Sequence, residues 1–237
     1  MLPQELWYPR FQLASDCSLL ITFGDGISRK HHSDVARLFT LLQSEQNPGI
    51  RNIHPAYSSL LVSFDPLCVS PAEFEAFVRG LVDRIDSLEP LPSRRVEIPV
   101  CYDSTLGPDI GFVAAHNNIS LDEVVQLHSS PQYLVYFLGF APGFPYLGEL
   151  PARLVTPRLP TPRVKIPAGS VAIGGSQTGI YPVSTPGGWR IIGRTPLTLF
   201  QADRNPPSLL QMGNIVQFKP ITAEEFRDLT DREKRTA

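Results

Sequence analysis

The side chains best suited to chemistry in this chain are six bases that no acidic residue accompanies. Between Leu150 and Ala202 the sequence contains no Asp or Glu, but it contains Arg153, Arg158, Arg163, Lys165, Arg190 and Arg194. The whole chain has a net charge of −2, so its carboxylates are concentrated elsewhere. A local positive field of this kind suits a small anion or an acidic partner surface. The alternative is a solvated basic face that an acidic neighbouring domain balances.

A glycine-rich segment, residues 174–179 (GGSQTG), lies inside this basic stretch. Successive backbone N–H groups in such a segment can bind an anion. A β-turn explains the same glycines equally well. Both interpretations stay open at the level of sequence.

The sequence contains no self-contained catalytic motif. We find no GxGxxG fingerprint, Walker A loop, HExxH, GxSxG or closely spaced metal ligands. Ser170, Ser176 and Ser184 have no histidine near them in the sequence, although a distant histidine could approach them in space. The pattern therefore indicates groups that bind and position a ligand, and it assigns no catalytic residue.

Size and composition indicate a soluble globular protein. The chain has 237 residues, of which 42% are hydrophobic and 19% charged. No apolar run reaches the roughly 18 residues of a membrane span. The net charge argues against general nucleic-acid binding.

The chain has three cysteines, Cys17, Cys68 and Cys101. Their odd number and wide spacing fit neither a disulfide framework nor a zinc site. The N-terminus lacks a signal-peptide pattern. We therefore expect a cytoplasmic protein with no membrane or nucleic-acid partner.

The basic residues belong to one long stretch, Gly139–Pro196, which is unusually rich in glycine and proline. A stretch so rich in glycine and proline is predicted to be either disordered or built from many defined turns. Disordered segments are poor in aromatic and β-branched residues, whereas this stretch contains Phe140, Phe144, Tyr146, Tyr181 and Trp189. We therefore expect ordered, loop-rich β structure with a surface to present.

The first ninety residues have the pattern of a small α/β unit. We expect a strand within residues 11–23, a helix over 33–46, strands over 50–54 and 59–64, and a second helix that starts at the capping box of Ser70 and Glu73. The order strand–helix–strand–strand–helix is a split βαβ pattern. The proline-rich segment 89–93 marks a boundary, so we place a first domain at residues 1–92.

A second domain is predicted for residues 93–222, followed by a charged helical tail at 223–237. It should contain a strand over 94–102, a short helix over 109–118, a helix that starts at the capping box of Ser120 and Glu123, and a strand over 133–140. His128 ends the apolar stripe of the second of these helices. A hydrogen-bonded structural histidine and a residue of a binding site are both compatible with that position.

Residues 139–148, GFAPGFPYLG, resemble the GFxPGFPYLG signature of the PxpB/KipI family, which is also called the allophanate hydrolase subunit 1 or carboxyltransferase C/D-domain family. Three further blocks agree with that family: Pro157-Arg158 with Pro162-Arg163, residues 167–182, and residues 186–196. They follow in family order, and a looser similarity covers nearly the whole chain. Two small departures are Thr185, where the family commonly has serine, and Lys165, where it is often less basic.

The resemblance implies an α+β N-terminal domain followed by a cyclophilin-like β-barrel domain. It implies a subunit of ATP-dependent 5-oxoprolinase, a hydrolase that opens 5-oxo-L-proline to L-glutamate together with PxpA-type and PxpC-type subunits, the latter similar to allophanate hydrolase subunit 2. Such a subunit would not be active alone. The alternatives are a KipI-like inhibitor of a sensor histidine kinase and an allophanate hydrolase or urea carboxylase-type subunit. The complex would use ATP, and no metal or biotin is expected on this chain.

Within such an assembly we expect the Gly139–Pro196 stretch to hold the substrate or a partner. Arg158 and Arg194 would bind the anion, because arginine is a planar, bidentate partner of carboxylate and phosphate. Gln177 and Thr178 would hydrogen-bond polar groups of the substrate. The pocket or the partner interface would be walled by Phe140, Phe144, Tyr146, Tyr181, Trp189 and His128. Packing in the barrel core is the alternative for the aromatic residues.

Overall fold

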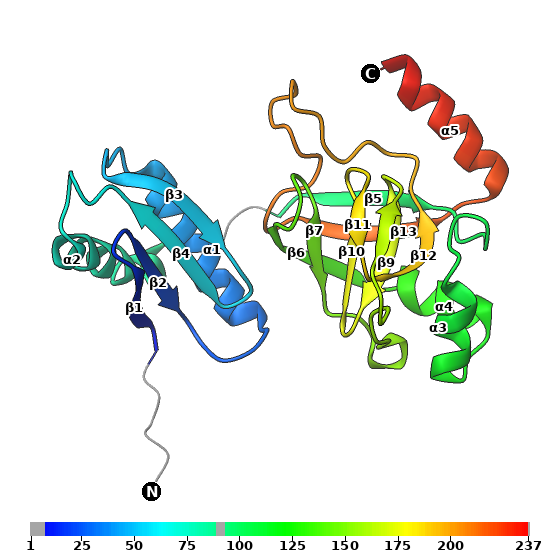
Figure 1. Cartoon of the computed structure of the whole chain (residues 1–237), viewed down its shortest axis with the longest axis horizontal. Helices are drawn as coiled ribbons and strands as arrows, with labels where there is room; N and C mark the ends of the chain where they lie inside the picture. Colours follow the sequence, from blue (N-terminus) through cyan, green and yellow to red (C-terminus); the bar gives the residue numbers. More distant parts are fainter. Residues whose placement is uncertain (1–7, 89–92, 237) are drawn as a thin grey trace, which may run out of the picture. The chain divides into compact units, whose positions relative to one another are not determined.

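The computed structural model describes residues 8–88 and 93–236, which fall into two compact units, Met1–Pro92 and Ser93–Ala237 (Figure 1). The proline-rich segment predicted to separate two domains lies outside the described residues, apart from Ser93. Among the described residues, no helix combines the length and the apolar character needed to cross a bilayer.

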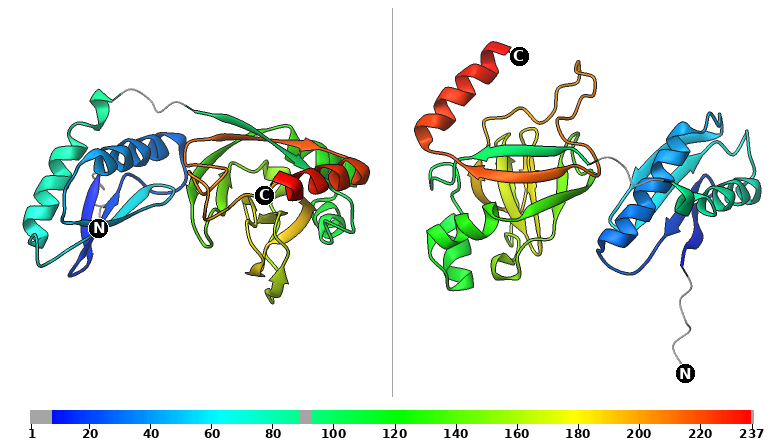
Figure 2. Two further views of the ribbon diagram at one scale, coloured as in Figure 1. Left: turned by 90° about the horizontal axis from the view of Figure 1, so that it is seen from above. Right: turned by 180° about the vertical axis from the view of Figure 1, so that it is seen from behind.

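The first unit is an antiparallel sheet with two helices packed on one of its faces (Figure 2). Its strands pair in the order β1-β2-β4-β3 and are β1 (Arg10–Ser15), β2 (Ser18–Thr22), β3 (Ile50–Pro55) and β4 (Ser59–Phe64). The helices are α1 (Arg29–Ser44) and α2 (Pro71–Val82), followed by the 3₁₀ turn η1 (Ile85–Ser87). Every second residue of β4 is buried, so one face of the sheet forms the core with the helices.

The predicted elements of this unit are confirmed from residue 28 onward, but the first strand is not. The capping box of Ser70 and Glu73 starts α2, and β3 and β4 lie where alternation predicted them. The predicted single strand over 11–23 is wrong, because the chain turns at Asp16–Cys17 and forms a hairpin. The Ser15 hydroxyl accepts from the Cys17 N–H at 3.2 Å and fixes this turn. The order is therefore ββαββα instead of a split βαβ.

The second unit is built on a seven-stranded mixed sheet that curls into a nearly closed barrel (Figure 1). The strands pair in the order β12-β9-β10-β7-β6-β13-β5, and only β13 and β5 run parallel. They are β5 (Arg95–Val100), β6 (Gln132–Leu138), β7 (Pro145–Gly148), β9 (Ser170–Gly174), β10 (Gln177–Ile180), β12 (Arg190–Arg194) and β13 (Ile215–Pro220). A lone pair between Cys101 and Arg194, with two backbone hydrogen bonds of 2.9 Å, joins the two edges of the sheet.

Two short strands, β8 (Arg163–Ile166) and β11 (Thr185–Gly187), form a separate antiparallel ribbon that we call the arm. The helices of the unit are α3 (Ile110–Asn117), α4 (Leu121–Ser129), the 3₁₀ turn η2 (Ala152–Leu154) and α5 (Ala223–Thr236). α3 packs on β12 and α4 on β13. The predicted helices and the predicted loop-rich β structure of the Gly139–Pro196 stretch are confirmed, since that stretch contains every strand from β7 to β12.

Closure of the barrel depends on a close backbone approach at Gly193. A Cβ at this position would lie 2.8 Å from the Cys101 carbonyl oxygen, whereas a Cβ on Gly111 of α3 would meet nothing within 4 Å. We expect Gly193→Ala to lower the free energy of unfolding by about 1–3 kcal/mol through overpacking. Gly111→Ala, in the same unit, should raise it by about 0.5–1 kcal/mol through helix propensity. Urea denaturation of both variants checks this, and a neutral Gly193→Ala would contradict the role of this contact.

Candidate functional site

A pocket lined mainly by aromatic side chains lies between the barrel and the arm. Its volume is about 180 Å³. Glycines 187 and 188 at the end of the arm line one wall, with residues of the loop before it. The side chains that give it its character are Phe140, Phe144, Tyr146, Arg158, Tyr181 and Trp189. We call it the aromatic pocket. The structure thus brings together six of the residues that the sequence singled out.

Phe144 is the centre of this cluster. It is buried, and its ring lies edge-to-face at 5.2 Å from Tyr181 and at 5.5 Å from Trp189, measured between centroids. Edge-to-face packing brings the positive edge of one ring to the negative face of another and stabilises each pair by about 0.5–1.5 kcal/mol beyond its buried area. The rings of Phe144, Tyr181 and Trp189 therefore pack against one another in a buried cluster, and the same rings line the pocket.

Phe140 lies at the pocket but, unlike Phe144, is 61% exposed. Its backbone is left-handed, with φ at 67°, which is uncommon for a residue with a side chain. Hydrogen bonds on both sides fix this conformation: the Ala141 N–H donates to the Gly139 carbonyl at 2.8 Å and the Phe144 N–H donates to the Ala141 carbonyl at 3.0 Å. The loop therefore holds an apolar ring out toward solvent.

Arg158 is the cation of the aromatic pocket. Its guanidinium lies 5.5 Å from the centroid of the Trp189 ring, within the range of a cation–π contact. No carboxylate lines the pocket, and none pairs with Arg158 in the part of the chain that the structure describes. Burial raises the pKa of the Tyr146 and Tyr181 phenols, and the Arg158 charge opposes that rise. Both phenols are therefore neutral at pH 7, and they line the pocket together with the Arg158 guanidinium.

Three of the six bases are neutralised by acids that precede the basic stretch in the sequence. Arg163 makes a two-pronged ion pair with Asp109, Arg190 lies 3.9 Å from the same carboxylate, and Arg153 pairs with Glu123. The uniform positive field expected from the sequence is thus reduced, and the balancing acids come from the start of α3 and α4 of the same unit. Sequence reasoning missed Asp109, because no local signal links it to residues 54 and 81 positions away.

Arg194 does not share the pocket with Arg158. Its Nε donates to the Ala168 carbonyl at 2.8 Å, and desolvation lowers its pKa. It lines a separate hollow of about 380 Å³ beside α5, together with Lys234. Arg158 and Arg194, both predicted to bind an anion, therefore line different pockets.

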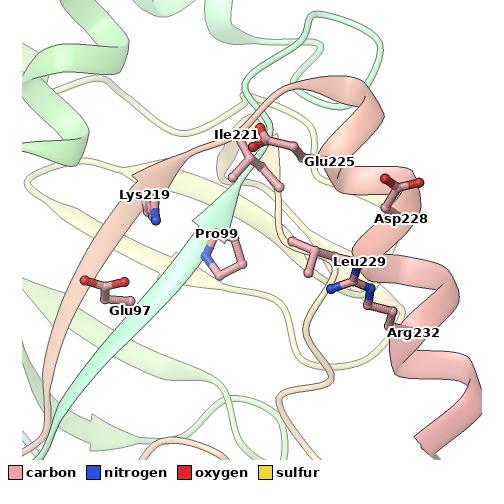
Figure 3. Close-up of a pocket in the computed structure, with 8 residues that line it drawn as sticks. All are labelled: Glu97, Pro99, Lys219, Ile221, Glu225, Asp228, Leu229 and Arg232. Atoms are coloured by element: carbon pink, nitrogen blue, oxygen red, sulfur yellow. The ribbon is translucent and has the colours of Figure 1, made fainter.

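A third hollow, of about 420 Å³, lies between α5 and the parallel pair β5 and β13 (Figure 3). Its charged side chains are of both signs, with Glu97, Glu225 and Asp228 against Lys219 and Arg232. This mixture does not match an anion site.

The glycine-rich segment 174–179 forms the β9–β10 hairpin. Gly175 has a φ of 67°, and its N–H donates to the Thr156 carbonyl at 2.8 Å. The turn interpretation therefore accounts for these glycines. Gln177 and Thr178 belong to β10 and neither lines the aromatic pocket, so their predicted contact with substrate has no support from this pocket.

His128 is fully buried and lies in a hydrogen-bonded chain inside the barrel. The Thr178 hydroxyl donates to the Ala172 carbonyl at 3.0 Å, so its oxygen accepts from His128 Nε2 at 2.9 Å. Nδ1 then accepts from the Tyr102 hydroxyl at 2.7 Å. Both ring nitrogens are satisfied in the neutral form, and burial lowers the pKa of His128 to about 3. His128 does not line the aromatic pocket, and the structural interpretation of this residue accounts for its contacts.

No group of three or more His, Cys, Asp or Glu side chains is placed to hold a metal ion in the described ranges. The three cysteines are free thiols.

A family model described as "Carboxyltransferase domain, subdomain C and D" matches residues 9–210. The chain is 41% identical over 230 residues to the 5-oxoprolinase B subunit of Bacillus subtilis, covering 92% of this chain and 95% of that protein. It is 57% identical over 135 residues to the 5-oxoprolinase B subunit of Escherichia coli O157:H7, covering 57% of this chain and 62% of that protein. The solved structure of TTHA0988 is similar with a TM-score of 0.77 and 37% identity over 87% of this chain, which spans 40% of that longer chain.

The buried His128 makes the stability of the second unit depend on pH. Its folded pKa of about 3 lies below the ordinary value of 6.5, so below pH 6.5 the unfolded chain binds a proton that the folded chain excludes. The stabilisation is fully present above pH 6.5 and is lost as the pH falls toward 3. We expect a loss of about 2 kcal/mol between pH 7 and pH 5 from this group.

Urea denaturation at both pH values measures that loss. His128→Gln should be less stable at pH 7 but should lose less stability at pH 5 than the parent chain. His116→Gln, at an exposed histidine of α3, is the control and should keep the parent's pH dependence. Equal pH dependence in the parent chain and His128→Gln would show that His128 is not the titrating group.

Proposed function

This chain belongs to the family of carboxyltransferase subdomains C and D, and from that membership we propose that it is the B subunit of an ATP-dependent 5-oxoprolinase. The observation that supports this proposal most directly is the 41% identity to the Bacillus subtilis 5-oxoprolinase B subunit along 95% of that protein's length. The proposed reaction opens 5-oxo-L-proline to L-glutamate in a complex with A-type and C-type subunits.

The aromatic pocket is the proposed binding site for 5-oxoproline on this chain. Its volume of about 180 Å³ is below the roughly 300–1,000 Å³ of pockets that hold drug-sized ligands, so it suits a small ring compound. The lactam ring would pack on Phe144 and Trp189, and the carboxylate would accept from the Arg158 guanidinium in bidentate fashion. The neutral phenols of Tyr146 and Tyr181 line the same pocket and would border the remaining oxygen atoms.

ATP would bind on a partner subunit. The aromatic pocket is too small for a nucleotide, and the sequence has no Walker A loop. In the proposed reaction the lactam oxygen takes up the γ-phosphoryl group of ATP, and ADP leaves. A first water attacks the ring carbon, and the C–N bond breaks as the nitrogen takes a proton, which gives an acyl phosphate. A second water hydrolyses the acyl phosphate to L-glutamate and phosphate. This chain would contribute by holding the ring and the carboxylate in place and by excluding water from one side.

The barrel of the second unit is, in this proposal, of the cyclophilin-like type. The seven-stranded mixed sheet, closed by the pair of Cys101 and Arg194, supports that assignment.

The proposed partner surface includes exposed apolar side chains near the pocket. Phe140 is 61% exposed, and Val164 on strand β8 of the arm is 88% exposed. Interfaces use aromatic and arginine anchors in this way, and Arg158 lies in the pocket between the barrel and the arm. The match to two fifths of the longer TTHA0988 chain is consistent with a unit that works beside further domains.

The proposal predicts that the purified chain alone does not release glutamate from 5-oxoproline and ATP, because its pocket binds and positions without a catalytic set of its own. Adding A-type and C-type subunits should produce turnover, and the chain should co-elute with the C-type subunit in size-exclusion chromatography. Turnover by this chain in isolation would disprove the proposal that it needs the A-type and C-type subunits for catalysis. Absence of both co-elution and turnover, together with inhibition of a histidine kinase's autophosphorylation, would favour the inhibitor function instead.

Arg158→Lys tests the substrate contact, because lysine keeps the charge but loses the planar fork. We expect a loss of about 1–3 kcal/mol of binding, measured as a KM for 5-oxoproline about ten- to hundred-fold higher, with an unchanged melting temperature. Arg153→Lys, at an exposed base of the same stretch, is the matched control and should change neither. A parental KM in Arg158→Lys would exclude Arg158 from the substrate site.

A further inference from the structure

The geometry points to Asp109 as a positioning residue, which fixes the wall of the aromatic pocket and leaves Arg158 as the cation facing into it. Asp109 does not line the pocket, and it acts through Arg163 of the arm. The inference rests on the proposed function only where it names 5-oxoproline as the ligand. The placement of the arm by Asp109 is independent of that identity.

The Asp109 carboxylate is almost completely buried and is fully used in contacts with two distant segments. Its two oxygens accept from the two terminal nitrogens of Arg163, each at 2.9 Å. One oxygen also accepts from the Ile191 N–H at 2.7 Å, while the Asp109 N–H donates to the Ile191 carbonyl at 2.9 Å. The residue therefore pairs with β12 in the manner of a short strand and simultaneously anchors the arm.

Arg163 connects this carboxylate to the pocket wall. It is the first residue of β8 and is paired with Gly187 of β11. Gly187 and Gly188 line the pocket, and the Leu159 N–H donates to the Gly188 carbonyl at 2.7 Å. A shift of Arg163 would therefore move the glycine wall and the start of the segment that carries Trp189.

The same carboxylate sets the local charge. Arg190 lies 3.9 Å from it, donates from Nε to the Pro157 carbonyl, and stacks 3.6 Å above the Phe112 ring. Arg163 and Arg190 are thus held by Asp109, whereas Arg158 is not. Without Asp109, both arginines would lose the carboxylate that neutralises them, although Arg190 would keep its contacts with Pro157 and Phe112.

A purely structural role for Asp109 is the competing explanation, since removing one member of a buried ion pair destabilises most proteins. Two readouts separate the explanations. The first is KM against kcat in the reconstituted complex, because a misplaced binding wall raises KM and leaves kcat largely unchanged. The second is the access of acrylamide to Trp189 in the chain alone, in a Trp7→Phe background that leaves one tryptophan.

The test uses Asp109→Asn, which keeps the shape and can still accept from the Ile191 N–H. It also uses Arg163→Gln, which removes the same contact from the more exposed partner, whose side chain is 30% exposed. We expect either variant to raise the KM for 5-oxoproline about ten- to hundred-fold and to increase quenching of Trp189. The double variant should be no worse than the single ones, because Asp109 acts through Arg163. Arg153→Gln, which removes the exposed pair with Glu123, should leave both readouts unchanged.

Asp109→Asn or Arg163→Gln with a lowered melting temperature but parental KM and parental quenching would overturn the inference, and so would fully additive effects in the double variant. If the parent complex shows no turnover, the proposed function fails, while the quenching of Trp189 still decides whether Asp109 places the arm.

Discussion

Strand β12 is one edge of the seven-stranded sheet, and the unit depends on how the open hydrogen-bonding groups of that edge are satisfied. Unpaired backbone N–H and C=O groups inside a protein are costly, and an open edge also invites pairing with another chain. Two segments of the same unit pair with this edge. Cys101 exchanges two backbone hydrogen bonds with Arg194, and Asp109 exchanges one backbone bond and one side-chain bond with Ile191. Closing the barrel and placing Asp109 are therefore parts of one arrangement.

Charge compensation follows from that arrangement. A carboxylate that is buried to pair with β12 needs cations around it, and Arg163 and Arg190 lie within 4 Å of it. The arm is thereby attached to the barrel at the point where the edge is covered. Arg158 takes no part in these contacts. It lines the pocket instead, where its guanidinium lies over the Trp189 ring. Three bases of a stretch that is uniformly basic in sequence are thus paired with acids, while Arg158 is the base that lines the aromatic pocket.

Features with local causes could be predicted from the sequence, whereas those with distant causes could not. The boxes Ser70–Glu73 and Ser120–Glu123 lie within one helical turn, so α2 and α4 begin where expected. The hairpin of β1 and β2 was missed because its turn at Asp16–Cys17 contains no glycine or proline to mark it. The family blocks pointed to the aromatic residues of the pocket. The separation of Arg158 from Arg194 and the hydrogen-bonded chain of His128 depend instead on contacts between segments far apart in the sequence, which no local pattern reports.

The fixed backbone of Phe140 has a consequence for the kinetics of assembly. A loop that must become ordered on binding loses conformational entropy at that moment, and this lowers affinity and slows the productive encounter. Here the left-handed residue is already held by hydrogen bonds on both sides. The entropy of ordering this backbone has been lost during folding of the chain itself. A partner of the proposed kind would therefore meet a loop whose backbone needs no ordering, and only the rotamer of the Phe140 ring would be left to settle on contact.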